Sequence, residues 1–173
     1  MESRVKIFGH AVHPILVVFP LGLLATAVIF DVVYLITGDA AMALIAFWMI
    51  GAGLIGGAIA APFGWIDWFA IAHGTRAKRI GLVHGLGNVI VLVLFFVSWW
   101  FRYVNRAQSP EAIAMALSFA GAGLAIVTGW LGGELVQRLG VGIDTGANLN
   151  APSSLSSERP TVPLHEKLAG WMK

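Results

Sequence analysis

Four long runs of apolar residues divide the chain, and each is long enough to cross a lipid bilayer as a helix. They extend over about 12–36, 40–65, 82–101 and 113–135. A membrane-spanning helix needs about 20 mostly apolar residues, so the pattern predicts an all-α membrane protein with four transmembrane helices. Asp39 is placed to cap the second helix, and Ser109, Pro110 and Glu111 are placed to start the fourth.

The composition strengthens this prediction and excludes several classes of protein. Of the 173 residues, 58% are hydrophobic and 12% are charged, with a mean hydropathy of +0.81. Soluble domains carry roughly 25% charged residues, so an ordinary soluble enzyme is excluded and a lipid bilayer is the expected environment. The absence of cysteine excludes disulfides, cysteine-ligated iron–sulfur clusters and covalently attached c-type haem. A net charge of +2 does not indicate a nucleic-acid partner.

The distribution of Lys and Arg predicts the orientation. Nine of these 11 residues lie in the N-terminal segment, in the loop after the second apolar run and in the C-terminal segment, whereas Arg102 and Arg106 lie on the other side. Positively charged loops stay in the cytoplasm, so we expect a multi-pass protein with both termini cytoplasmic. The first apolar run is longer than the core of a signal peptide, and we interpret it as an uncleaved first span.

The composition changes after the fourth run. We therefore divide the chain into a transmembrane domain, residues 1–139, and a mobile cytoplasmic tail, residues 140–173. Residues 148–161 are rich in Ser, Pro and Asn and lack an apolar period. Residues 164–171 are a candidate for a short amphipathic helix at the membrane surface.

The four helices form two hairpins with related sequences. Val12-His13 begins the first hairpin and Gly64-Trp65 lies near its end, 51 residues after the histidine. Val83-His84 begins the second, and Gly129-Trp130 follows 45 residues after that histidine. Both hairpins enter from the same side, so we predict a duplicated hairpin with a pseudo-twofold axis along the membrane normal.

Ionisable side chains gather at the cytoplasmic ends of the helices. His10, His13 and His84 come from the outgoing helices, and Asp67 and Glu134 come from the returning ones. Ionisable residues within membrane helices usually face the bundle interior and belong to a functional site. We expect each carboxylate to hydrogen-bond the histidine of its own hairpin, which would leave the other ring nitrogen free to bind a metal.

Three chemistries fit this set. His13 and His84, with His10 nearby, are candidate ligands of a b-type haem. His13, His84, Asp67 and Glu134 are candidate ligands of a non-haem Zn, Fe or Mn ion. The same groups also suit a proton relay. A cofactor-free interpretation, in which these residues only cap and anchor the helices, stays open beside them.

Several motifs resemble a family of bacterial inner-membrane proteins known as domain of unknown function twenty-two thirty-one. The resemblance covers about residues 8–143 and lies in HP at 13–14, FPLGLL at 19–24, PFGWIDW at 62–68, HGLGN at 84–88, GGELV at 132–136 and GVG at 140–142. It implies a four-helix inner-membrane domain, sometimes joined to Rieske-type iron–sulfur domains, and therefore suggests a redox context. It implies no established activity.

The leading functional hypothesis is an inner-membrane protein that holds haem b near the cytoplasmic face and exchanges electrons with quinone or with a redox partner protein. A second hypothesis is a scaffold or accessory subunit, without catalytic activity of its own, that acts in a homo-oligomer or a larger membrane complex. A third is a small transporter of protons or metal ions. Asp31 lies about 27 Å along the first helix from His13 at 1.5 Å per residue, and we expect it to hydrogen-bond a neighbouring helix.

Overall fold

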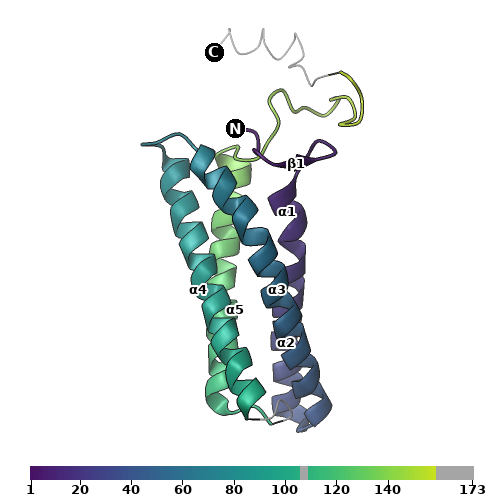
Figure 1. The fold of residues 1–173 in the computed structure, drawn as a ribbon, viewed down its shortest axis with the longest axis vertical. Helices are drawn as coiled ribbons and strands as arrows, with labels where there is room; N and C mark the ends of the chain where they lie inside the picture. The colour runs from purple at the N-terminus through teal and green to yellow at the C-terminus, as the bar shows by residue number, and fades with distance from the viewer. Residues whose placement is uncertain (106–108, 159–173) are drawn as a thin grey trace.

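A computed structural model describes residues 1–105 and 109–158 as a bundle of long helices with a small cap at one end (Figure 1). The membrane part consists of α1 (Val12–Leu16), α2 (Val18–Thr37), α3 (Ala40–Ala70), α4 (Arg76–Val104), α5 (Ala112–Gly133) and the π-helix η1 (Glu134–Arg138). We call α1–α3 hairpin 1, and α4, α5 and η1 hairpin 2. Four segments, Val12–Thr37, Ala40–Ala70, Arg76–Val104 and Ala112–Arg138, are long and apolar enough to cross a membrane, as the sequence predicts.

The helix ends agree with the sequence in part. The side chain of Asp39 accepts a hydrogen bond from the Ala41 amide at 2.9 Å, so it caps α3 as expected. The predicted start of α5 is wrong in detail, because Glu111 is the N-cap residue and its side chain makes no capping bond. Thr75 caps α4 through the Lys78 amide, at 3.1 Å, and lies several residues before the apolar run begins.

The first span lacks one main-chain hydrogen bond near its start. α1 ends at Leu16 and α2 begins at Val18, but Val17 keeps a helical backbone, and its amide and carbonyl bond His13 and Leu21 at 3.1 Å. Pro20 has no amide hydrogen to bond the carbonyl of Leu16 one turn earlier, and this missing bond separates α1 from α2. His13 therefore lies in the first turn of its span, whereas His84 lies further inside α4.

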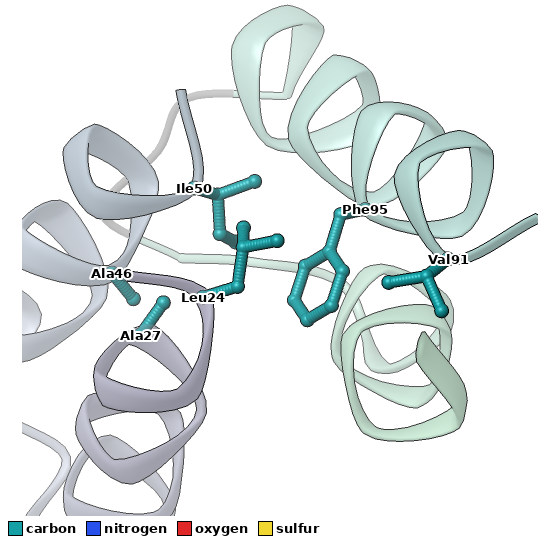
Figure 2. Close-up of a cluster of buried hydrophobic side chains, with 6 residues drawn as sticks. All are labelled: Leu24, Ala27, Ala46, Ile50, Val91 and Phe95. Carbon is teal, nitrogen blue, oxygen red and sulfur yellow. The ribbon is translucent and has the colours of Figure 1, made fainter. Parts of the chain in front are cut away.

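The four long helices form a ring in which each packs on two neighbours. α2 packs along α3 and α5, and α4 packs along the same two helices, so α2 and α4 occupy opposite corners. Figure 2 shows the apolar contact between the hairpins, where Leu24 and Ile50 of hairpin 1 face Phe95 and Val91 of hairpin 2. Many large apolar side chains outside this core are exposed, such as Ile36 at 78% and Ile126 at 76%, which is the distribution expected of a bundle surrounded by lipid.

Residues 1–11, which we call the N-terminal strap, cover the end of the bundle where both hairpins begin. β1 (Lys6–Ile7) and β2 (His10–Ala11) pair antiparallel across a tight turn at Phe8 and Gly9. Residues 140–158 contain no helix or strand, and part of them packs on the strap, since the Gly142 amide donates to the Met1 carbonyl at 2.8 Å. The expected amphipathic helix at 164–171 lies outside the described residues.

Candidate functional site

His13 and His84 are held in the same way by the returning helix of their own hairpin. The Nδ1 atom of His13 lies 3.0 Å from the carbonyl oxygen of Ala60, and that of His84 lies 2.8 Å from the carbonyl oxygen of Thr128. A carbonyl oxygen only accepts, so each Nδ1 carries a proton and donates it. In the neutral ring, Nε2 is then the unprotonated nitrogen, which can accept a hydrogen bond or bind a metal.

A glycine makes each of these contacts possible. A Cβ atom at Gly64 would lie 2.7 Å from Cε1 of His13, and a Cβ at Gly132 would lie 3.1 Å from Cε1 of His84. Each glycine lies one helical turn after the carbonyl that its histidine binds. Because no side chain stands between, the imidazole can reach the main chain of the neighbouring helix.

These contacts correct the register of the internal repeat. Positions in α4 follow those in α1 and α2 by 71 residues, as His84 follows His13, and positions in α5 follow those in α3 by 68, as Gly132 follows Gly64. The glycine equivalent to Gly64 is therefore Gly132, three residues later than the Gly129 that the Gly-Trp match selected.

A second contact follows the corrected register. A Cβ at Gly53 would meet Leu24, and a Cβ at Gly121 would meet Phe95. The same offsets of 71 and 68 residues relate these two contacts. The two hairpins are thus packed alike at two levels, which supports their description as repeated units.

The two histidines differ in how firmly they are held. The amide nitrogen of Asn88 lies 3.3 Å from Nε2 of His84 and donates to the His84 carbonyl at 2.9 Å, and the Thr128 hydroxyl donates to the Asn88 side chain at 3.0 Å. The positions equivalent to Asn88 and Thr128 in hairpin 1 are Val17 and Ala60. Asn88 and Thr128 therefore surround His84 with a network of hydrogen bonds. For the His13 side chain, the described residues show one hydrogen bond, to the carbonyl of Ala60.

The expectation that Asp67 and Glu134 orient the histidines is wrong. Asp67 accepts hydrogen bonds from the Ser3 hydroxyl at 2.7 and 3.0 Å and from the Arg4 amide at 2.7 Å, so it fastens the strap. Glu134 forms an ion pair with Arg76 at 2.7 Å, which joins the end of α5 to the start of α4. Main-chain carbonyls, and not these carboxylates, accept the hydrogen bonds of the two histidines.

The remaining histidines of the described region lie apart from this pair. His10 lies in the strap, where Nε2 is 3.3 Å from the Ser154 hydroxyl. His73 lies in the exposed α3–α4 loop. Among residues 1–105 and 109–158, no three His, Asp or Glu side chains are grouped closely enough to hold a metal ion.

A charged cluster that the sequence did not reveal lies inside the opposite end of the bundle. Asp31 and Arg102 form a two-pronged ion pair, with both oxygen–nitrogen distances at 2.7 Å and both side chains fully buried. The Ser98 hydroxyl accepts from Nε of Arg102 at 3.3 Å, and the Ser118 hydroxyl donates to Asp31 at 2.9 Å. The sequence assigns Arg102 to a loop, because the third apolar run ends at residue 101. A serine one turn before the arginine was the available sequence signal.

Outside the membrane part, charge also stabilises the strap. The Lys6 ammonium bonds Glu2 at 2.8 Å and also contacts Asp144. The hydrogen bond from Lys6, followed by those from Thr145, lowers the pKa of Glu2 from 4.5 to about 2. Asp144 and then Glu2 raise the pKa of Lys6.

The comparisons with known proteins agree with this architecture. Residues 9–145 match the model of a family described as a predicted membrane protein, DUF2231. Neither the search of curated proteins nor the search of solved structures gave a match. The matched range includes the four long helices, both histidines and the buried ion pair.

Proposed function

The chain belongs to DUF2231, a family of predicted membrane proteins, and from this premise we propose that its bundle holds a b-type haem between His13 and His84. The proposed role is electron transfer with quinone or a redox partner protein. The chain is an integral membrane protein, so the electron would be exchanged within or at the surface of the bilayer.

The observation that carries the proposal is the shared hydrogen-bonding state of the two imidazoles. Both Nδ1 protons are donated to main-chain carbonyls, which fixes the tautomer and leaves Nε2 as the unprotonated nitrogen of each ring. At His84, the Asn88 amide that lies 3.3 Å from Nε2 would have to turn away for iron to bind. The two rings come from equivalent positions of two repeated hairpins and lie at the same end of the bundle. This arrangement suits a ligand shared across a pseudo-twofold axis.

The two hairpins differ in how a bulky side chain fills the end of the bundle that carries the histidines. Trp65 of α3 packs on α4, where its ring lies 3.3 Å from a Cβ placed at Gly85. In hairpin 2 the equivalent of Trp65 is Gly133, and a Cβ placed there or at Gly129 would meet nothing within 4 Å. Hairpin 2 thus lacks an indole at the position equivalent to Trp65, and no side chain of its own fills the space beside Gly133.

The donor set favours haem over a non-haem ion. A bound Zn, Fe or Mn ion normally takes three or more protein ligands, and Asp67 and Glu134 are already bonded to the strap and to Arg76. Haem would need only the imidazoles of His13 and His84 from the protein, and it would supply one-electron chemistry when bound. The protein's own task is then to hold the two rings and exclude water.

The charge distribution supports a cytoplasmic location for this site in a bacterial inner membrane. At the end of the bundle that carries the strap, the described part of the chain places Arg4, Lys6, Arg76, Lys78, Arg79 and Arg138. At the other end Arg102 is fully buried against Asp31 and contributes no surface charge. By the positive-inside rule, the strap and the two histidines face the cytoplasm.

The test is the absorption spectrum of the full chain purified in detergent with haem supplied during expression. We expect a Soret band that shifts on reduction with dithionite. His84→Ala should remove at least about nine tenths of the bound haem, because a lost axial ligand costs metal affinity of at least 10–100-fold. His13→Ala should weaken binding as well, and His73→Ala, in the exposed loop, should leave the spectrum unchanged.

A colourless, fully folded protein would contradict the haem proposal. Equal haem loss in His84→Ala and His73→Ala would contradict the assignment of the ligands. Stable co-purification of the colourless chain with a larger membrane complex would instead support the scaffold hypothesis.

A further inference from the structure

The buried ion pair connects two positions that the internal repeat makes equivalent. Arg102 follows Asp31 by the same 71 residues that separate His84 from His13. α2 and α4 occupy opposite corners of the bundle, so side chains that meet between them meet near its central axis. One pair of equivalent positions therefore carries two histidines, and the other pair carries opposite charges.

The surroundings of the ion pair follow the same equivalence. Three further pairs of equivalent positions are fully buried beside it, each with 0% exposure: Ala27 and Ser98, Ile50 and Ser118, and Ala46 and Ala114. At two of these pairs hairpin 2 has a serine where hairpin 1 has an apolar residue. Hairpin 2 thus supplies the cation and both hydroxyls that bond the pair, and hairpin 1 supplies the anion.

Such a site discriminates strongly between partners. Two hairpins of the first kind would place two Asp31 carboxylates together on the axis, and two of the second kind would place two Arg102 guanidinium groups there. A buried pair of like charges costs far more free energy than a buried pair of opposite charges, because neither like charge is compensated in a low-dielectric interior. Only the mixed combination satisfies every charge.

We propose that Asp31 and Arg102 are a partner-selection element: the inner face of each hairpin is an interaction surface that accepts the other hairpin and rejects a copy of itself. This directs two repeats with similar packing surfaces into one bundle within one chain. It also prevents hairpins of neighbouring chains from pairing with their own kind in the membrane. The proposal does not depend on haem binding.

Charge reversal in the full chain tests the proposal. Asp31→Arg alone and Arg102→Asp alone each create a buried like-charge pair, and each should lower the midpoint of thermal unfolding in detergent by about 10 °C or more. The exchanged chain, with both substitutions, should recover at least about half of that loss.

A further variant of the exchanged chain also exchanges Ala27 with Ser98 and Ile50 with Ser118, so that both hydroxyls move with the cation. This variant should recover more of the unfolding midpoint. Arg138→Asp, at an exposed position, is the matched charge-reversal control and should change the midpoint by no more than about 2 °C.

Co-expression of the two single variants with different tags tests selection between chains. The Asp31→Arg chain carries two arginines at these positions and the Arg102→Asp chain carries two aspartates, so exchanging hairpins between the chains satisfies all four charges. We expect a one-to-one complex that contains both tags, and no such complex when both tagged chains are wild type. An exchanged chain no more stable than the single variants would overturn the proposal, and so would single variants whose two tags never co-purify.

Discussion

At the scale of single residues, the site depends on glycines as much as on histidines. An imidazole reaches the main chain of the next helix only where that helix lacks a side chain, as at Gly64 and Gly132. The sequence identified the two histidines and the helix ends at which they lie. It did not identify what they bind. Asp67 and Glu134 were the expected partners, and every residue has a backbone carbonyl, so the sequence does not show which carbonyl accepts a hydrogen bond.

Alanine substitutions at three glycines separate this contact from helix propensity. Gly64→Ala should destabilise the bundle by about 1–3 kcal/mol, because the new Cβ must displace the His13 ring, and Gly132→Ala should cost less because its clash is milder. Gly129→Ala, where a Cβ meets nothing within 4 Å, should be neutral or stabilise the helix by up to about 1 kcal/mol. Thermal unfolding in detergent measures all three, and equal effects at positions 64 and 129 would contradict the contact.

At the scale of elements, the apolar pattern predicted the four helices because membrane spans are set by length and hydrophobicity alone. It missed two features that depend on particular contacts. The separation of α1 from α2 arises from one missing hydrogen bond at Pro20, and the strap folds over the bundle because Asp67 binds Ser3 and Arg4. The strap depends on a partner more than 60 residues away, which no local period reveals.

The strap should loosen in acid. The pKa of Glu2 is lowered from 4.5 to about 2, so its contribution is complete above about pH 4.5 and is lost as the pH falls toward 2. Protonation removes the charge that Lys6 and Thr145 bind. Hydrogen exchange of strap amides should therefore speed up over this range relative to the α3 amides. In the Glu2→Gln variant, exchange of the strap amides should already be fast at neutral pH and should depend little on pH over this range. Strap exchange with the same pH dependence as in the wild-type chain would contradict the role of Glu2.

At the scale of the whole molecule, the repeat explains the placement of both polar sites. Equivalent positions on α1 and α4 carry His13 and His84, and equivalent positions on α2 and α4 carry Asp31 and Arg102. The sequence predicted the duplication from short matches, but it aligned the returning helices of the two hairpins wrongly by three residues. Only packing across the bundle fixes that register, because glycine–tryptophan pairs recur by chance in a chain with 21 glycines and seven tryptophans.

The central claim is that the His84 imidazole itself binds a haem. Chemical rescue tests it most directly: His84→Gly removes the ring and leaves a space of its size, which free imidazole can enter. We predict that the purified variant has lost haem, and that adding imidazole and haem together restores the Soret band of the wild-type chain, whereas haem alone does not. A folded variant that imidazole leaves unchanged, or a wild-type chain that binds no haem, would contradict the account.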